Sequence, residues 1–313
     1  MNILFCGEGF SNAIDHLKPL LSDYNLRICP ENRVQDHVAK TDVIIPFITN
    51  VDEKLMKQGN FGLVQQFGVG LGVVDIEAAT RNKIWVARVP SAESGNAESV
   101  AEHAIMLMMM LSRKFHEIQN VLQAREVGRP IGQTLFGKRA CIIGLGGIGR
   151  ALARRLHSLD MHVTGIHEYP ERGVPSGVDR LFGLSDYTEA VHNADYVILC
   201  LNYRVSRHHF IDKPELQAIK PGAFFINIAR GGFLNHDALL HILQTEHLAG
   251  AGLDVFAEEP VNPDHPLFQH NVIATPHIGG VTNASFKGTA RIVVDNINRY
   301  AQGKEPLYSA NNI

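Results

Sequence analysis

The sequence predicts an α/β protein made of two doubly wound domains, each built around a mainly parallel sheet. The chain has 313 residues, of which 45% are hydrophobic and 19% charged, and single hydrophobic cores stop growing at about 250–300 residues. Two domains with sizeable cores are therefore expected. Short apolar runs alternate with longer amphipathic ones, which is typical of βαβ units. A glycine pattern typical of phosphate-binding turns lies near the middle of the chain.

Apolar runs in the first third predict the strands of a first domain. They are NILFC (2–6), DVIIPFI (42–48), GLVQQF (62–67) and IWVARV (84–89). Helical patterns at 11–23 and 52–59 lie between them, so the strands are expected to pair in parallel.

A long helical pattern then interrupts the alternation. It spans residues 99–124, is rich in methionine, and is followed by the loop-like stretch 127–138. Methionine fills irregular apolar gaps without special chemistry. We therefore expect one helix that packs in the core or against another subunit.

A second alternating series begins at residue 139 and predicts a second domain. Its strands are ACIIG (140–144), HVTGI (162–166), DYVILCL (195–201), AFFINIA (223–229), LAGAGLDVF (248–256) and NVIATPH (271–277). A final helical pattern covers residues 284–301.

Composition excludes several classes of function. The net charge is −3, so no global attraction to nucleic acid or to an anionic membrane is expected. The apolar run 104–111 is far shorter than the ~18 residues that indicate a membrane span, and the first residues read as a strand and not a signal peptide. The four cysteines show no CxxC spacing, and three lie in apolar runs. A reducing cytoplasm fits this pattern, and no metal site is predicted.

The glycine pattern GxGxxG is the strongest local signal. It consists of Gly144, Gly146 and Gly149, with an apolar strand before it and an amphipathic helix after it. The first glycine permits a tight turn, the second lets the backbone approach a pyrophosphate, and the third lets helix and strand pack closely. The helix start, at Gly147 and Ile148, would present free N–H groups to that diphosphate. A dinucleotide site is predicted.

The choice between NAD and NADP depends on the end of the next strand. An acidic residue is expected there to bind the adenosine ribose, but His167 occupies the usual position and Glu168 comes one place later. Glu168 favours NAD because its charge repels a 2′-phosphate. Arg172 or Arg204 would instead attract that phosphate, so NADP stays possible.

The chain resembles the D-isomer-specific 2-hydroxyacid dehydrogenases over almost its whole length. The resemblance is carried by GVGLGVVDIEAA, SVAEHAIMLMM, GLGGIG, INIARGG, GAGLDVFAEEP and TPHIGG, in the family's order and spacing. It implies a substrate domain of residues 1–98 with 285–313 and a Rossmann-like NAD(P)-binding domain of residues 99–284, beside a flavodoxin-like first domain. The active site would lie in the cleft between the domains.

The resemblance also implies three catalytic residues. His277 of TPH would be the acid/base for the substrate oxygen, Glu259 of DVFxxEP would pair with its imidazole, and Arg230 would hold the substrate carboxylate. The chemistry fits, because a carboxylate favours the charged imidazole and fixes its tautomer. A planar guanidinium also matches a carboxylate bidentately.

Further positions carry over from the same resemblance. The backbone N–H groups of Val69, Gly70 and Leu71 would take the substrate carboxylate, and Asp254 would contact the nicotinamide carboxamide. Ala229, Gly279 and Gly280 would also border the cofactor. His103 is better explained by packing. The chain departs from the family after the third strand of the second domain, where residues 202–204 read NYR instead of PLT and Arg207 follows.

The implied function is the reduction of a small 2-keto acid to its D-2-hydroxy acid. Candidate substrates are glyoxylate, hydroxypyruvate and pyruvate, and the relatives include D-lactate and phosphoglycerate dehydrogenases. Oxidation of phosphite and a dinucleotide-sensing corepressor are the alternatives; the short stretch after the last helix favours the enzyme. The family also implies a homodimer built on the methionine-rich helix. The sequence does not determine which of these acids is the substrate.

Overall fold

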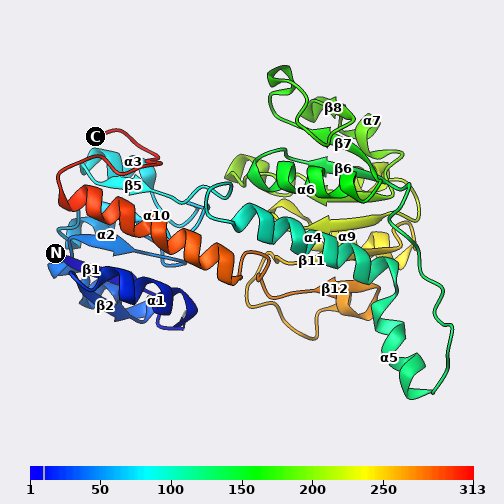
Figure 1. Ribbon diagram of the computed structural model, residues 1–313, viewed down its shortest axis with the longest axis horizontal. Coiled ribbons are helices and arrows are strands. Elements are labelled where there is room, and N and C mark those ends of the chain that lie inside the picture. The colour runs from blue at the N-terminus through cyan, green and yellow to red at the C-terminus, as the bar shows by residue number, and fades with distance from the viewer. Residues whose placement is uncertain (10) are drawn as a thin grey trace. The chain divides into compact units, whose positions relative to one another are not determined.

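The computed structural model describes residues 1–9 and 11–313, and within them the chain divides into two compact units. Unit 1 comprises Met1–Asn96 and Val281–Ile313, and unit 2 comprises Ala97–Gly280. Figure 1 shows the elements of each unit along the chain. The domain boundaries at 98/99 and 284/285 stay a prediction from the sequence.

Unit 1 contains, among its described residues, a five-stranded parallel sheet in the order β2-β1-β3-β4-β5. The strands are β1 (Asn2–Cys6), β2 (Asn25–Cys29), β3 (Val43–Ile45), β4 (Leu63–Gln65) and β5 (Trp85–Ala87). The prediction of parallel pairing is confirmed. β2 was not predicted, because only its last residue is buried and no continuous apolar run marks it.

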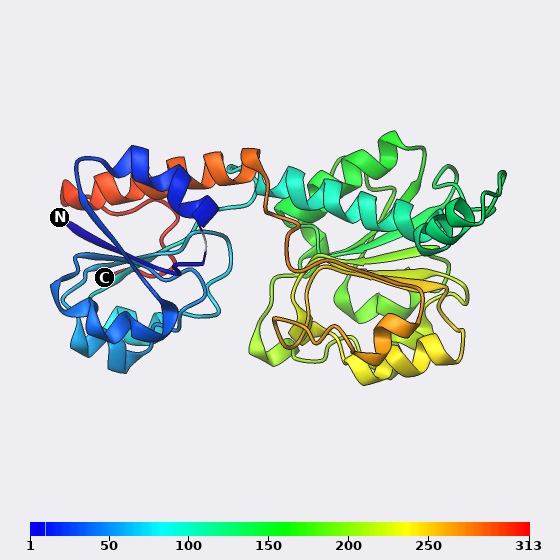
Figure 2. The ribbon, with the colours of Figure 1, turned by 90° about the horizontal axis from the view of Figure 1, so that it is seen from below.

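Helices cover both faces of this sheet, as Figure 2 shows. One face carries α1 (Ser11–Leu17) and α10 (Asn283–Ala301), and the other carries α2 (Glu53–Gln58) and α3 (Ile76–Arg81). The carboxylates of Asp52 and Asp75 cap the last two helices by accepting from Leu55 N and Ala78 N. Short 3₁₀ turns at Lys18–Leu21, Glu31–Asp36 and Val38–Lys40 complete the connections.

Unit 2 contains, in its described residues, a seven-stranded parallel sheet in the order β12-β11-β10-β9-β6-β7-β8. The strands are β6 (Arg139–Ile143), β7 (His162–Ile166), β8 (Arg180–Phe182), β9 (Tyr196–Leu199), β10 (Phe224–Asn227), β11 (Gly250–Leu253) and β12 (Val272–Ala274). The chain order reverses between β6 and β9. Ligands of doubly wound folds bind at the carboxyl ends of the strands beside such a reversal.

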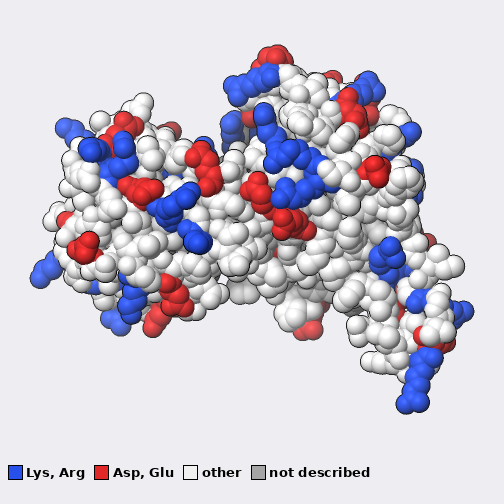
Figure 3. Space-filling view, in the orientation of Figure 1, with Lys and Arg blue, Asp and Glu red and all other residues white. Residues whose placement is uncertain are grey.

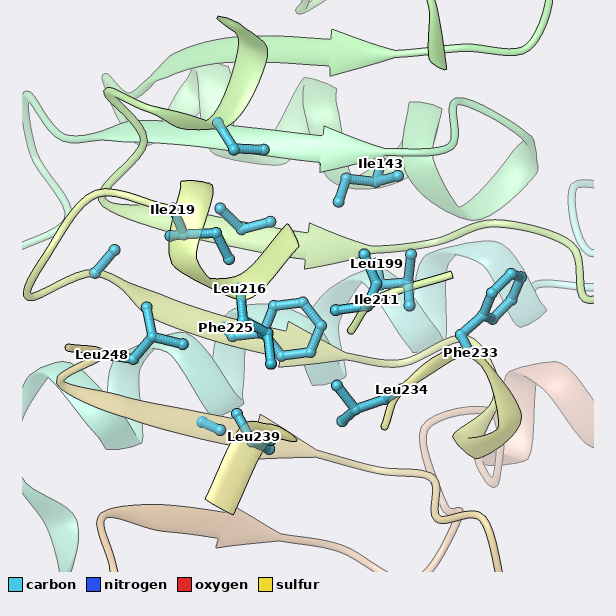
Figure 4. Packing of buried hydrophobic residues seen from close by; sticks show 14 of the residues in the cluster. Ile143, Leu199, Ile211, Leu216, Ile219, Phe225, Phe233, Leu234, Leu239 and Leu248 are labelled. Atoms are coloured by element: carbon cyan, nitrogen blue, oxygen red, sulfur yellow. The ribbon is translucent and has the colours of Figure 1, made fainter. Parts of the chain in front are cut away.

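The sheet of unit 2 is also covered on both faces (Figure 2). α4 (Asn96–Ser112) and α6 (Gly147–Ser158) pack on one face, and α7 (Tyr187–Val191), α8 (Lys213–Ala218) and α9 (His236–Gln244) on the other. Figure 4 shows the core on the face that carries α7, α8 and α9, in which Phe225 of β10 lies among leucines of the flanking elements. Single 3₁₀ turns occur at Pro170–Arg172, Leu184–Asp186, Val205–Arg207, Gly231–Phe233 and Pro266–Gln269.

The expected single helix over 99–124 is wrong. α4 ends at Ser112, and α5 (Phe115–Gln123) follows a break at Lys114, whose φ is 54°. A continuing helix needs the Ser112 carbonyl for its next turn, but that oxygen accepts instead from Gln133 N at 2.8 Å. The returning chain therefore ends the helix.

Charges on the face of unit 2 that carries α4 and α6 are mixed in sign. Figure 3 shows basic groups over α6 next to acidic groups over α4. The contacts include Arg155 with Glu102 at 3.2 Å and Arg154 with Glu98 at 3.9 Å. Among the described helices, none is long and apolar enough to cross a membrane.

Candidate active site

The glycine turn after β6 has a geometry that only glycine permits. Gly144 has a φ of 103°, and a Cβ there would lie 2.8 Å from Cys200 C and Leu201 N. A Cβ on Gly149 would lie 2.0 Å from the carbonyl oxygen of Gly144. The turn therefore packs against the residues just after β9 and against its own helix.

The middle glycine faces open space instead. Gly146 is the N-cap of α6, no described side chain caps this end, and apart from its chain neighbours no described residue has an atom within 4 Å of where its Cβ would be. Gly147 begins the helix, and Ile148 packs against the core. An uncapped helix start behind an open glycine fits a dinucleotide pyrophosphate.

Beyond β7, Glu168 forms ion pairs with two arginines. Arg207 Nη2 lies 2.7 Å and Arg204 Nη1 3.3 Å from its Oε1. His167 is turned toward its own backbone, where Nδ1 accepts from Tyr169 N at 2.9 Å. Both arginines come from the segment after β9 that departs from the family pattern. From the sequence, Arg204 was considered only as a group that would attract a 2′-phosphate, so its ion pair with Glu168 and that of Arg207 were missed.

The turn after β10 holds Arg230. The fully buried side chain of Asn227 accepts from Ala229 N at 3.0 Å and donates to Arg230 O at 3.1 Å. The guanidinium of Arg230 donates to Ala229 O at 2.6 Å. A Cβ on Gly231 would lie 1.8 Å from Phe256 C, so this turn packs directly against the loop after β11. Asn227 and Gly231 were not singled out, although INIARGG contains both.

Glu259 and His277 are brought together at the carboxyl ends of β11 and β12. His277 Nδ1 lies 2.8 Å from Glu259 Oε2, and Glu259 Oε1 accepts from Phe256 N at 2.9 Å. Burial raises the pKa of Glu259, but the hydrogen bonds from His277 and Phe256 and the charge of Arg230 hold that pKa below its ordinary value. The carboxylate is therefore ionised at neutral pH.

Asp254 lies beneath the loop that carries His277. Its side chain is 4% exposed and accepts from Thr275 Oγ1, Ile278 N and Gly279 N at 2.7–2.9 Å. Ala229 is buried, and Gly280 is half-buried at the end of unit 2. Arg230, Asp254, Glu259, His277 and Gly279 thus all lie at the ends of three neighbouring strands.

The residues proposed to bind the substrate carboxylate through their backbone lie in unit 1. Val69, Gly70 and Leu71 follow β4, and none of their N–H groups donates to an acceptor in the described part of the chain. Gln66 shapes this loop, because its Nε2 donates to Phe47 O and to Gly70 O, each at 2.9 Å.

Comparison with known proteins places the chain in a family. Residues 105–279 match the family described as D-isomer specific 2-hydroxyacid dehydrogenase, NAD binding domain. A glyoxylate reductase of Thermococcus litoralis is 30% identical over 290 residues, which cover 88% of this chain and 86% of that protein. A D-3-phosphoglycerate dehydrogenase of Mycobacterium leprae is 35% identical over 246 residues, covering 77% of this chain and 45% of that protein.

A solved structure agrees with this placement. The NAD-dependent formate dehydrogenase from Staphylococcus aureus in complex with NAD has a TM-score of 0.82 at 26% identity, covering 97% of this chain and 96% of that one. The parallel sheets and the glycine turn define a dinucleotide-binding α/β protein, and the family match makes it an NAD-binding oxidoreductase. The chain belongs to the D-isomer specific 2-hydroxyacid dehydrogenase family, and its NAD-binding domain includes residues 105–279. The predicted fold class, family and NAD cofactor are confirmed.

Proposed function

We propose that the protein reduces a small 2-keto acid to its D-2-hydroxy acid and also catalyses the reverse oxidation. The observation that carries this proposal is the 2.8 Å contact between His277 Nδ1 and Glu259 Oε2, beside the turn that holds Arg230. A carboxylate-held imidazole is an acid/base. The name of the T. litoralis relative, glyoxylate reductase, favours glyoxylate as the first candidate, and hydroxypyruvate and pyruvate are the other small 2-keto acids to test.

Proton transfer is assigned to His277. In reduction, the carbonyl carbon gains a hydride with both electrons and the carbonyl oxygen gains a proton. A dihydronicotinamide, when bound, supplies that hydride. Because Nδ1 faces Glu259, Nε2 is the nitrogen left to give its proton to the substrate oxygen, and Glu259 stabilises the imidazolium that precedes this step.

Substrate binding is assigned to Arg230 and to the loop after β4. The guanidinium would take the substrate carboxylate through two parallel hydrogen bonds. The N–H groups of Val69, Gly70 and Leu71 would share that carboxylate, since they have no described protein acceptor. Binding by fixed N–H groups and one cation selects anionic substrates.

The cofactor is proposed to be NADH in preference to NADPH. Both arginine contacts of Glu168 are to Oε1, and Oε2 has no described partner, which leaves one carboxylate oxygen for a ribose hydroxyl. Arg204 is exposed enough to meet a 2′-phosphate, so NADPH would be used more weakly. The remaining proposed cofactor contacts are Gly144, Gly146, Gly147, Ile148, Gly149, His167, Ala229, Asp254, Gly279 and Gly280.

A turnover assay tests the proposal. Purified protein is given glyoxylate, hydroxypyruvate, pyruvate and phosphite with each reduced or oxidised cofactor, and the product's configuration is determined by chiral chromatography. We expect a D-2-hydroxy acid from at least one keto acid. NADH binding without turnover of any keto acid would overturn the proposed reaction, and turnover of phosphite alone would replace it.

We further propose a homodimer in the cytoplasm. The cysteines of the chain are buried free thiols, as suits a reducing compartment. The segment 113–136, here called the arm, exposes Leu122, Val127, Ile131 and Phe136 at 63–93%. A second copy would cover this apolar surface.

A further inference from the structure

The backbone at His277 is held in a conformation that ordinary residues avoid. Its φ is 56°, in the left-handed region where Cβ approaches the following carbonyl. Such a conformation persists only where the surroundings determine it. Something in unit 2 must therefore hold the loop from Thr275 to Gly279 in place.

Asp254 supplies most of that support. Its backbone oxygen accepts from His277 N at 2.8 Å. Its carboxylate accepts from Ile278 N at 2.8 Å, from Gly279 N at 2.9 Å and from the Thr275 hydroxyl at 2.7 Å. The backbone N–H groups of three successive residues, His277, Ile278 and Gly279, thus donate to one buried residue.

His103 of α4 completes the arrangement from the other side. Its Nε2 lies 2.9 Å from Thr275 Oγ1 and 3.3 Å from Asp254 Oδ1, and its side chain is 10% exposed. The Thr275 hydroxyl already gives its proton to Asp254. Its oxygen can therefore only accept, and His103 must carry a hydrogen on Nε2.

The packing of Gly279 supports the same connection. A Cβ on Gly279 would lie 2.8 Å from Asp254 Oδ2 and 3.5 Å from His103 Cδ2. The loop thus lies directly on the His103–Asp254 pair, with no space for a side chain between them. Burial raises the pKa of Asp254, but hydrogen bonds from His103, Thr275 and the loop N–H groups outweigh it and lower that pKa.

We propose that His103 is a positioning residue, which acts through Thr275 and Asp254 to hold the loop that presents His277. The inference rests on the proposed role of His277 in catalysis. Without the Nε2 donor, the Thr275 hydroxyl and the Asp254 carboxylate lose a buried partner, and the loop opens more often. The imidazole then spends less time where it can donate a proton, while Arg230 and the glycine turn after β6, which lie outside this loop, stay in place.

The test compares His103→Leu with His103→Gln. Leucine removes the donor, whereas the glutamine amide restores an N–H of similar reach. His247→Leu is the matched control, because His247 is also half-buried and bonds one ring nitrogen to a backbone carbonyl, Ile219 O at 2.9 Å. Thr275→Val removes the link itself and serves if the leucine variant does not fold.

Amide hydrogen exchange of the free protein gives the first readout and needs no substrate. Exchange at Ile278 and Gly279 is expected to quicken about 10-fold or more in His103→Leu and Thr275→Val, because local opening becomes easier. His103→Gln and His247→Leu should keep the rates of the unaltered protein. Unchanged exchange in both His103→Leu and Thr275→Val would overturn the proposal, whether or not the protein reduces any keto acid.

Steady-state kinetics give the second readout. His103→Leu should lower kcat about 10-fold with KM for the keto acid nearly unchanged, since misplacement of a reacting group slows chemistry and not substrate binding. His103→Gln should recover most of kcat. A loss of the same size in His103→Gln, or a rise in KM with kcat unchanged, would contradict the positioning role.

Discussion

At the scale of single residues, the His277–Glu259 contact makes a prediction about pH. Reduction needs the imidazolium, so reductive kcat/KM should fall as rising pH removes its proton, and oxidative kcat/KM should climb over the same interval. The lowered pKa of Glu259 keeps its carboxylate charged throughout that interval. In Glu259→Gln this charge is gone and the imidazolium loses its partner, so the maximum rates should fall, though less than in His277→Ala. Rates measured in both directions test this prediction; unchanged maximum rates would show that the two residues are not coupled.

The same lowered pKa fixes the sign of a stability effect. A carboxylate whose folded pKa lies below its ordinary value of about 4.3 stabilises the fold above that value and ceases to do so as pH falls through the folded pKa. The unaltered protein should therefore have a higher Tm than Glu259→Gln at neutral pH, and this difference should vanish in acid.

His277→Ala is the catalytic control: it should lose about 10²–10⁴-fold in activity while still binding NADH.

Arg230 gives a third prediction at this scale. Because it is proposed to hold the substrate carboxylate, Arg230→Lys should raise KM for the keto acid strongly and also lower kcat, since an ammonium cannot reproduce the bidentate contact. Kd for NADH should barely change. Near-normal turnover in Arg230→Ala would remove this residue from the site.

Cofactor choice depends on Glu168 and its arginines. kcat/KM should be higher with NADH than with NADPH, and Glu168→Ser should narrow the gap. Arg204→Ala should widen it, because the removed cation is 58% exposed and placed to meet a 2′-phosphate. Arg207, 15% exposed, holds the carboxylate and provides the contrast: its loss should weaken NADH use. A preference of the unaltered enzyme for NADPH would reverse these assignments.

At the scale of elements, two glycines of the turn after β6 are expected to have different roles, one in folding and one in cofactor binding. Gly149→Ala places a Cβ 2.0 Å from the Gly144 carbonyl oxygen, whereas Gly146→Ala meets no described residue within 4 Å apart from its chain neighbours. The first variant should lose Tm by many degrees or not fold. The second should keep its Tm and lose about 10-fold or more in NADH affinity, measured by fluorescence titration, because a methyl group fills the pyrophosphate position. Equal Tm losses in both would contradict this distinction.

Elements with continuous apolar runs were predictable, and half-exposed ones were not. β6, β9 and β10 are buried along most of their length, so composition alone marks them. β8 has one buried residue, and the end of α4 depends on Gln133 returning to Ser112, a contact that no local pattern contains. In the site, motif order indicated His277, Glu259 and Arg230. The links from His103 to Asp254 and from Arg207 to Glu168 join residues far apart in sequence and needed the fold.

At the scale of the whole molecule, the arm gives a prediction about assembly. Every residue of α5, all of them described, is exposed or half-buried, and the helix contributes nothing to the core of its own unit. Leu122→Lys with Ile131→Lys should convert a dimer into a monomer at micromolar concentration, as light scattering would show, and should lower the Tm only by the stabilisation that the subunit contact supplied. Leu20→Lys, at a 51% exposed site of unit 1, is the control. A monomer before any substitution would refute the dimer.

The division of unit 1 into two stretches of chain has a consequence for how the protein is made. α10 supplies Val293 and Ile297 to one core of that unit, and its Asn298 accepts from Tyr24 Oη, 274 positions earlier. A ribosome therefore synthesises the whole of unit 2 before unit 1 can complete its fold. Until then, the apolar surface of unit 1 that α10 covers stays exposed to solvent. Contacts so distant along the chain form slowly. Nascent chains should accordingly depend on chaperones during this stage of translation. A nascent chain stalled before residue 283 should expose this apolar surface to chaperone binding.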